Sequence, residues 1–409
     1  MKHSKDDHLK SSKTFCMFPW LHLNVTPKGD VYPCCSSDYV EPFANVKDTT
    51  LEQAFNVERM KQLRLDMLAG RKNEACEFCY KHEESSPYSF RKYSIEKFAD
   101  KYDDLVPFTN QDGSLDKFTM AYYDIRFSNI CNFKCRTCGS EFSSKWGQEH
   151  KEHDAPPPGF RVVQHADESG KLLDQVLEQI PNIELAYFAG GEPLITDEHY
   201  TILEEMIANG SCKDITLRYN TNMSNFKYKK YDILDMWSNF KGVEVSASLD
   251  HYGEKAEYIR NGTKWFTVEN NLRKIRDVDF IDYQFNCVLS NLNYVTLGDF
   301  FTYMIDKDLL RKHDYISIYH LLNPSFYSAQ NLPPEEKEKG TLGLLKLINQ
   351  IKDEYWCVQH VENAMRFATS AHTWDEHGKE FIHNTSRRDK IRNENFVEVF
   401  PELAGLMNG

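Results

Sequence analysis

Three cysteines on one short segment, Cys131, Cys135 and Cys138, constrain this chain more than any other feature. Their spacing, C-x3-C-x2-C, gathers three thiolates on one loop and supplies no fourth thiolate nearby. An iron–sulfur cluster of four irons takes one cysteine thiolate per iron, so this loop would leave one iron open to a small molecule. An open coordination position is typical of a catalytic metal site and a closed one of a structural site. The spacing therefore predicts a catalytic iron–sulfur cluster.

A strand-like stretch, Met120–Phe127, precedes these cysteines. A second one, Ile183–Ala189, runs into the sequence Gly190-Gly191-Glu192-Pro193. In this order, and each after a strand, the two motifs resemble those of the radical S-adenosylmethionine (SAM) superfamily. Two other interpretations explain less. An accidental cluster of buried thiols is unexpected on a loop rich in Asn, Lys, Arg and Thr, and a zinc site would need a fourth ligand close by.

Length and composition restrict the class of protein. A chain of 409 residues is too long for one ordinary core and suits two or three domains. The net charge of −13 argues against a general nucleic-acid binder, because phosphate contacts need clustered positive charge. No apolar run approaches the ~20 residues of a membrane span, and the polar N-terminus does not resemble a signal peptide. The sequence therefore predicts a soluble, cytoplasmic protein.

Eleven cysteines in such a protein point to metal binding and not to disulfides. Seven of them form two organised groups, and the scattered Cys212, Cys287 and Cys357 are expected to be inert thiols.

Residues 14–93 are predicted to form a separate domain with a second metal site. Cys16 precedes an alternating stretch, a turn sequence rich in Pro and Gly follows, and the returning strand ends at Cys34. This hairpin would bring Cys16 near Cys34. A C-x2-C pair, Cys76 and Cys79, comes later in the domain, so four thiolates are expected to converge.

This layout resembles the SPASM and twitch modules of radical SAM enzymes, and cysteines for only one cluster make the shorter twitch form the closer match. The resemblance implies an auxiliary [4Fe–4S] cluster that assists electron transfer or supports the structure. Cys35 could replace Cys34 as a ligand. Four cysteines also satisfy a structural zinc site, which is the alternative. In better-known members this module follows the barrel, whereas here it precedes the barrel.

Strands and helices alternate over residues 115–325, the predicted core domain. Its further strands are expected at Ile215–Asn220, Val243–Leu249, Asp282–Val288 and Tyr315–Tyr319. Helices are expected at Leu51–Leu68 in the first domain, and at Glu198–Ala208, Tyr228–Phe240, Val268–Arg276 and Val295–Met304 in the core. Six β/α units predict an α/β fold, a parallel, partial (β/α)6 TIM-like barrel, which is also the fold of the superfamily.

Residues 326–409 are predicted to form a mainly helical C-terminal extension. Its candidate helices are Leu342–Ile351 and Val358–Phe367, and a packing role is the simpler expectation for them.

Ligands of parallel sheets bind at the carboxyl ends of the strands, where all of these motifs lie. The resemblance implies that the open iron binds the amino and carboxylate groups of the methionine part of SAM. The residues expected to contact SAM or substrate there are Gly190, Gly191, Glu192, Asn220, Asn222, Ser246, Ser248 and Arg260.

Their expected roles differ. The two glycines would let the backbone approach SAM closely, and the carboxylate of Glu192 would bind its positively charged amino group. Arg260 could hold the carboxylate with two hydrogen bonds, although polar residues at strand ends also cap the next helix. The residue before the last cysteine, often aromatic in the superfamily, is Thr137, so packing on adenine would fall to Phe133 or Tyr187.

The resemblance implies reductive cleavage of SAM to methionine and a 5′-deoxyadenosyl radical, which abstracts a hydrogen atom from a substrate. The expected cofactors are a [4Fe–4S] cluster on three cysteines, an auxiliary [4Fe–4S] cluster on four, and SAM. The expected partner is a reductant such as flavodoxin or ferredoxin. A small molecule, sugar or nucleotide is the first substrate class, and a peptide or protein side chain is the alternative. A metal-stabilised binding protein without catalysis is the third hypothesis.

Overall fold

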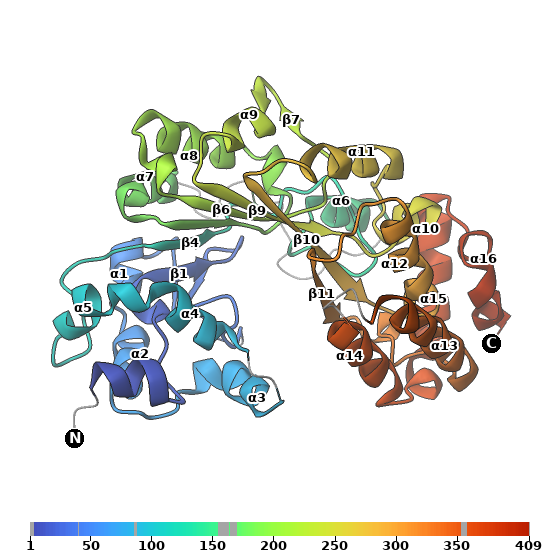
Figure 1. Cartoon of the computed structure of the whole chain (residues 1–409), viewed down its shortest axis with the longest axis horizontal. Helices are drawn as coiled ribbons and strands as arrows, with labels where there is room; N and C mark the ends of the chain where they lie inside the picture. Colours follow the sequence, from blue (N-terminus) through green and yellow to red (C-terminus); the bar gives the residue numbers. More distant parts are fainter. Residues whose placement is uncertain are drawn as a thin grey trace. The chain divides into compact units, whose positions relative to one another are not determined.

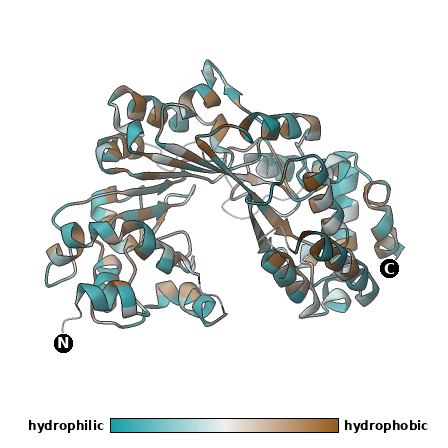
Figure 2. Ribbon diagram, in the orientation of Figure 1, coloured by the Kyte–Doolittle hydropathy of each residue, from teal (hydrophilic) through white to brown (hydrophobic). Residues whose placement is uncertain are grey.

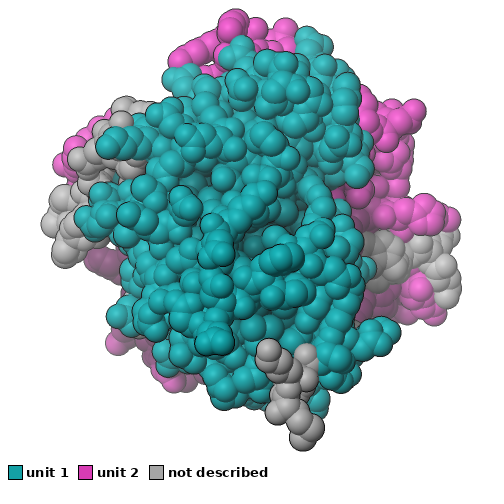
Figure 3. Space-filling model, turned by 90° about the vertical axis from the view of Figure 1, so that its left-hand side faces the viewer, with its two compact units in different colours: residues 1–129, 162–218, 235–242 teal, residues 130–161, 219–234, 243–409 magenta. Residues whose placement is uncertain are grey.

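The computed structural model describes residues 4–39, 41–85, 88–153, 163, 170–352 and 358–408 (Figure 1). Cys357 lies outside these residues. The chain divides into two compact units, coloured in Figure 3. Unit 1 contains residues 1–129, 162–218 and 235–242, and unit 2 contains residues 130–161, 219–234 and 243–409. The predicted boundaries of three domains, 14–93, 115–325 and 326–409, remain predictions.

Unit 1 begins with the predicted hairpin. Strands β1 (His22–Val25) and β2 (Asp30–Tyr32) pair antiparallel, with Asn24 opposite Tyr32, and β3 (Ala44–Asn45) pairs with β2. The turn needs a glycine, because Gly29 has a φ of 89°. The hairpin prediction is confirmed.

A parallel pairing joins this hairpin to the next strands. Strand β1 pairs in register with β4 (Tyr122–Ile125), from His22 opposite Tyr122 to Val25 opposite Ile125. Strand β4 pairs in turn with β5 (Leu185–Phe188), also parallel. The cysteine-bearing hairpin therefore continues the sheet of the core strands.

The predicted helix over Leu51–Leu68 is two helices, α1 (Leu51–Phe55) and α2 (Glu58–Leu68). The buried Arg64 explains the break. Its guanidinium donates to the carbonyl of Phe55 at 2.6 Å, to that of Pro19 and to that of Gly113, so the carbonyl of the last residue of α1 has a side-chain partner. The spacing of apolar residues does not reveal that this arginine is buried and bonded to main-chain carbonyl groups.

The other helices of unit 1 surround these strands. They are α3 (Glu77–Ser85), α4 (Phe90–Phe98), α5 (Tyr102–Leu105), α7 (Lys171–Gln179) and α8 (Asp197–Ala208). Most helices carry both hydrophilic and hydrophobic residues, as amphipathic helices of a globular protein do (Figure 2).

Unit 2 continues the alternation of strands and helices. Strands β9 (Gly242–Ser248), β10 (Ile281–Leu289) and β11 (Tyr315–His320) are parallel, with Ser248 opposite Asn286 and Val288 opposite Tyr319. Helices α10 (Gly253–Ile259), α11 (Trp265–Ile275) and α12 (Leu297–Asp306) connect them. Strand β6 (Thr216–Thr221) has residues in both units. All six predicted core strands are present, and the α/β fold with a partial barrel is confirmed.

One predicted helix is wrong. Tyr228–Phe240 contains a small hairpin, β7 (Lys227–Tyr228) with β8 (Tyr231–Asp232), and only the short helix α9 (Ile233–Trp237). Lys229 has a φ of 52°, a left-handed conformation suited to a tight turn and incompatible with a continuing helix. The apolar periodicity of this stretch comes from the helix alone.

The C-terminal part of unit 2 is helical, as predicted. Its helices are α13 (Pro334–Ile351), α14 (Val358–Thr369), α15 (Trp374–Arg392) and α16 (Phe396–Val399), and α6 (Ser144–His153) lies earlier in the chain. Within the described ranges, no helix is both long and apolar enough to cross a membrane.

Helices α12 and α13 approach each other at glycines. A Cβ atom added to Gly298 would lie 2.8 Å from the carbonyl oxygen of Gly343, whereas one added to Gly343 would meet its nearest neighbour only at 3.8 Å. We expect Gly298→Ala to lower the free energy of unfolding by about 2 kcal/mol, because the backbones must separate. Gly343→Ala, the matched control on the same interface, should raise it by up to ~1 kcal/mol through helix propensity. Denaturant unfolding of both variants measures this difference, and equal effects would contradict the packing described.

Candidate metal-cluster and SAM site

Four thiols of unit 1 lie close together. Cys16 precedes β1, Cys34 follows β2, Cys76 comes directly before α3, and Cys79 lies in the first turn of α3. Burial raises the pKa of Cys34 well above its ordinary value, and the negative charges of Cys35, Cys16, Cys76 and Cys79 raise it further. Burial also raises the pKa of Cys76, with added repulsion from Cys16 and Cys79. These mutual effects show that the structure brings the four predicted auxiliary cysteines together.

The adjacent cysteines Cys34 and Cys35 have different surroundings. Three other thiols act on Cys34 besides its neighbour in the chain. Burial raises the pKa of Cys35 to about 12, and the charged groups with the largest effect on it are Asp124 and Arg126. These electrostatic surroundings favour Cys34 as the member of the group of four.

A buried ion pair between Arg91 and Glu83 lies near these thiols. Arg91 on α4 donates two hydrogen bonds to Glu83 on α3, at 2.8 and 2.6 Å, and a further one to the carbonyl of Phe15 at 2.9 Å. On the next turn of α4, the hydroxyl of Ser94 lies 3.1 Å from Sγ of Cys16. Arg91 lowers the pKa values of Cys16, Cys76 and Cys79, because its positive charge favours their thiolates. Sequence reasoning missed Arg91, since the cysteines that it acts on come from separate segments of the chain.

Polar side chains gather at the ends of β1 and β4, next to Cys35. The carboxylate of Asp124, fully buried, accepts a hydrogen bond from Asn24 at 2.8 Å and one from Arg126 at 3.2 Å. The hydroxyl of Tyr39 donates to the side-chain oxygen of Asn24 and to the carbonyl of Cys35. We call Asn24, Cys35, Tyr39, Asp124 and Arg126 the β1–β4 polar group.

The glycine-rich turn after β5 also belongs to unit 1. Gly190 has a φ of 118°, a conformation that favours glycine, and a Cβ atom there would make a tight contact of 3.2 Å with Cβ of Arg126. The carboxylate of Glu192 is buried and accepts a hydrogen bond from the amide of Leu194 at 3.3 Å. Glu192 therefore caps the short helix Pro193–Ile195, and its contact with SAM stays a prediction, as do those of Gly190 and Gly191.

The three-cysteine loop lies in unit 2 and is held through its backbone. The amides of Lys134 and Arg136 donate to the carbonyls of Asn261 and Ile259, both at 2.8 Å. The indole of Trp146, on α6, donates to the carbonyl of Cys135 at 2.8 Å. These bonds fix the chain on both sides of Cys135.

The side chains of Cys131, Cys135 and Cys138 are partly exposed. The surrounding protein still raises the pKa of Cys135 to about 12, chiefly by burial and also through repulsion from Cys138 and Asp250, whereas Arg260 and Arg392 lower it. Burial likewise raises the pKa of Cys138, and Arg260 lowers it. The loop is thus a set of neighbouring thiols that need positive charge to become thiolates.

Asn222 holds the same loop. Its side-chain amide donates to Oδ1 of Asn132 at 2.9 Å, and its oxygen accepts from the amide and the hydroxyl of Ser224. Asn132 donates in turn to the Ser224 hydroxyl at 2.8 Å. Sequence reasoning missed Asn132, although it stands between the first two cysteines. In this structure Asn222 ties two loops together, and a hydrogen bond to ribose or substrate stays a prediction.

Arg260 forms an ion pair with Asp250, a residue that the sequence did not single out. Its Nε lies 2.9 Å from Oδ2 of Asp250, and its Nη2 donates to Oδ1 of Asp250 at 3.1 Å. Asp250 is fully buried and also accepts from the amide of Val288 at 2.8 Å. The pair places a cation beside Cys135 and Cys138, so Arg260 acts on the cysteine loop whether or not it also reaches the carboxylate of SAM.

Three of the remaining predicted contact residues lie on strands, and Phe133 lies on the cysteine loop. Asn220 on β6 accepts a hydrogen bond from Asn286 on β10 at 3.1 Å. Ser246 on β9 accepts one from Gln284, and Ser248 ends β9. Phe133 is buried with its ring close to Gly262. Contacts of these four predicted residues with SAM stay predictions.

The described thiols are compatible with the iron–sulfur clusters that the sequence predicts. None of the ten described cysteines takes part in a disulfide. In the described part of the chain, no three His, Cys, Asp or Glu side chains are arranged around the position of a single metal ion. Neighbouring buried thiols with nearby arginines suit a bound iron–sulfur cluster, because its irons supply the charge that favours thiolates.

Comparison with known proteins agrees with this class of site. Residues 125–301 match the model of the radical SAM superfamily. Residues 16–80 match the model of SPASM, an iron–sulfur cluster-binding domain. The fold and the two thiol groups agree with these two matches. Residues 125–301 therefore match a radical SAM domain and residues 16–80 a SPASM domain, and the SPASM match precedes the barrel, as the sequence predicted. A radical SAM domain implies SAM and a [4Fe–4S] cluster, and a SPASM domain implies auxiliary iron–sulfur clusters.

Solved structures are more distant. One described as native anSMEcpe with bound AdoMet is 18% identical, with a TM-score of 0.39, over 57% of this chain and 60% of that one. Streptococcus suis SuiB bound to S-adenosylmethionine is 14% identical, with a TM-score of 0.39, over 72% of this chain and 63% of that one. TYW1 with a lysine-pyruvate adduct bound is 12% identical, with a TM-score of 0.32, over 58% of this chain and 72% of that one. The matched part is thus less than two thirds of the first two structures. Among proteins with curated descriptions, none matches the chain.

Gly262 supplies a test of how the cysteine loop is packed. Its φ is 111°, and a Cβ atom would lie 2.7 Å from the ring of Phe133 and 2.9 Å from the carbonyl oxygen of Asn132. We expect Gly262→Ala to lower the free energy of unfolding by about 3 kcal/mol, through backbone strain plus overpacking. Gly253 is the matched control, because its φ is also positive (57°) and a Cβ atom there meets nothing within 4 Å. Gly253→Ala should cost only about 1 kcal/mol. Denaturant unfolding of the metal-free protein compares the two, and an equal cost would contradict this packing.

Proposed function

We propose that this chain cleaves SAM reductively and uses the resulting radical to abstract a hydrogen atom from a substrate, with an auxiliary cluster assisting electron transfer. The observation that carries the proposal is the loop of Cys131, Cys135 and Cys138, held by backbone hydrogen bonds beside the Arg260–Asp250 pair. When bound, the cluster supplies one electron to the sulfonium of SAM, whose cleavage gives methionine and a 5′-deoxyadenosyl radical. Arg260 would offset the negative charge of the thiolates, and Asn132 and Asn222 would keep the loop in one position.

The ligands would be those that the sequence predicts. Cys131, Cys135 and Cys138 would hold the SAM-binding cluster. Cys16, Cys34, Cys76 and Cys79 would hold the auxiliary cluster, with Arg91 as a nearby cation. A reductant such as flavodoxin or ferredoxin would supply electrons.

For the substrate we infer a small polar molecule, such as a sugar or nucleotide. The β1–β4 polar group supports this choice. It places a buried carboxylate, a guanidinium and a tyrosine hydroxyl together beside Cys35, which follows Cys34 directly. Arg126, whose side chain is 15% exposed and held by the buried Asp124, could bind an anionic group of such a molecule. A peptide or protein side chain remains the second candidate. It would be favoured if polar peptides, and not sugars or nucleotides, stimulate cleavage of SAM.

The assay of SAM cleavage tests the chemistry. The full chain is reconstituted anaerobically with iron and sulfide, reduced with dithionite and mixed with SAM, and 5′-deoxyadenosine is quantified. We expect release by the unaltered protein, with about eight irons per chain, and none by the Cys131→Ala/Cys135→Ala/Cys138→Ala variant, which should keep about four irons. Release that survives the triple substitution, or zinc bound in place of iron, would overturn the proposal in favour of a metal-stabilised binding protein.

The auxiliary ligands have their own test in the pair Cys34 and Cys35. We expect Cys34→Ala to lower the iron content from about eight to about four per chain. Cys35→Ala is the matched control and should keep all of the iron, because Asp124 and Arg126 are the charged groups with the largest effect on this thiol. Iron and acid-labile sulfide are measured in both variants after reconstitution. The reverse pattern would assign the ligand to Cys35.

A further inference from the structure

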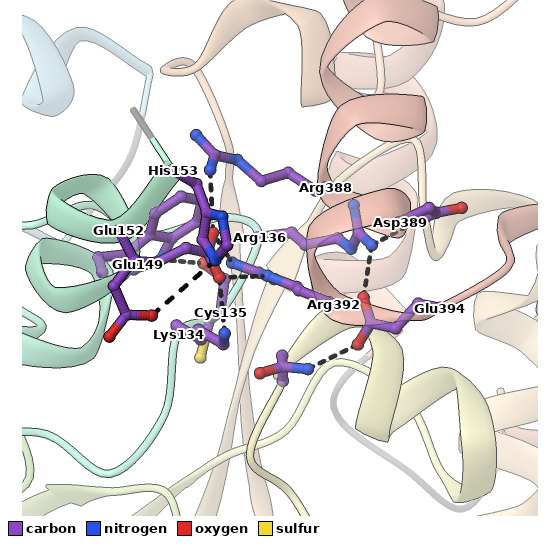
Figure 4. A network of polar contacts seen from close by, with 12 residues as sticks. Lys134, Cys135, Arg136, Glu149, Glu152, His153, Arg388, Asp389, Arg392 and Glu394 are labelled. Atoms are coloured by element: carbon purple, nitrogen blue, oxygen red, sulfur yellow. Dashed lines mark hydrogen bonds and ion pairs between the residues drawn. The ribbon is translucent and has the colours of Figure 1, made fainter. Parts of the chain in front are cut away.

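The C-terminal helix α15 makes buried charged contacts with the segment that carries the three cysteines (Figure 4). Arg136, which follows Cys135, has a fully buried side chain. Its Nη2 donates to Asp389 on α15 and to Glu394 just after it, both at 2.6 Å. Its guanidinium also lies 3.8 Å from the centre of the Tyr258 ring.

The two acceptors have further partners that fix their positions. Asp389 accepts from the hydroxyl of Tyr258 and from the amide of Phe396, both at 2.6 Å. Glu394 accepts from the amide side chain of Asn261 at 2.6 Å. The carbonyl of Asn261 binds the amide of Lys134 on the loop. Arg136 therefore meets carboxylates that are already held in place.

A second buried contact lies on α6, the helix that follows the cysteines. Glu149 accepts from Arg388 at 3.0 Å and from Arg392 at 2.9 and 3.2 Å, both on α15. It also pairs with Lys134 on the loop at 2.6 Å. The side chains of Glu149 and Arg392 are 2% and 1% exposed, so water does not replace these partners.

Trp146 links the contact between Glu149 and the arginines of α15 to Cys135, a proposed cluster ligand. The guanidinium carbons of Arg388 and Arg392 lie 4.8 and 4.7 Å from the centre of its ring. The indole nitrogen of the same residue donates to the carbonyl of Cys135. Helix α15 thus reaches the backbone of Cys135 through one intervening side chain.

We propose that α15 is a positioning element of the SAM-cluster site. Asp389 and Glu394 anchor Arg136, Arg388 and Arg392 anchor Glu149, and together they hold the cysteine loop in the geometry that binds iron. Removing one partner of a buried charge pair leaves the other uncompensated, so each contact has one favourable arrangement. This inference deepens the proposed function, and it assigns the C-terminal extension a specific role beyond packing.

The test neutralises the two acceptors of Arg136 without changing their shape, in the full-length variant Asp389→Asn/Glu394→Gln. The matched control is Glu376→Gln/Glu380→Gln, which removes two carboxylate charges from exposed positions on the same helix. In metal-free protein, iodoacetamide labelling of each cysteine is followed by mass spectrometry. Cys76 and Cys79, in unit 1, serve as internal references for folding.

We expect Cys135 and Cys138 of the variant to react roughly tenfold faster than in the unaltered protein, because the loop opens more often. Cys76 and Cys79 should react at an unchanged rate. After reconstitution, iron should fall from about eight to about four per chain, and the change that SAM causes in the electron paramagnetic resonance signal of the reduced protein should disappear. The exposed control should match the unaltered protein in all three measurements.

Two results would overturn the inference. Labelling rates, iron content and the SAM-dependent signal equal to those of the unaltered protein would show that α15 does not position the loop. Faster labelling of all four cysteines with loss of all iron would show that these carboxylates support the fold in general. The labelling experiment needs neither iron nor SAM, so its outcome is read separately from that of the SAM-cleavage assay.

Discussion

The parallel pairing of β1 with β4 is the constraint on which unit 1 depends. It makes the hairpin that carries Cys16 and Cys34 a continuation of the core sheet, with His22 opposite Tyr122 and Val25 opposite Ile125. Main-chain hydrogen bonds of this kind fix the register, because a shift by one residue would turn every side chain to the other face. A SPASM domain that precedes its barrel is therefore built into the barrel's sheet through backbone pairing.

Buried charge organises both groups of thiols. Arg91 with Glu83 lies beside the four cysteines of unit 1, and Arg260 with Asp250 lies beside the loop of unit 2. In each pair the carboxylate keeps the arginine in place, and the arginine favours the thiolate form of its neighbours. Such pairs cost desolvation free energy and add little to stability by themselves. Their value here lies in the electrostatic environment that they give to the iron–sulfur sites.

Much of the fold could be predicted because its signals are local. Alternating apolar residues located all six core strands, and cysteine spacing located both thiol groups. The failures have local physical causes as well. Arg64 separates α1 from α2 by binding the carbonyl of Phe55, and the left-handed turn at Lys229 replaces a predicted helix with a hairpin. Apolar periodicity does not detect a buried arginine or a positive φ.

The sequence by itself indicated the kind of cofactor sites in this protein, because three closely spaced cysteines and a glycine-rich turn after a strand are short-range patterns. Only the tertiary structure decided which side chains surround them. Arg260 meets Asp250 ten residues earlier, Arg91 meets the carbonyl of Phe15, and Arg136 meets carboxylates more than two hundred residues away. Cys34 and Cys35 are neighbours in the chain, and only the fold makes the other thiols act most strongly on Cys34 and Asp124 on Cys35. The physical reason is that burial and charge pairing depend on contacts between distant segments, which spacing along the chain does not encode.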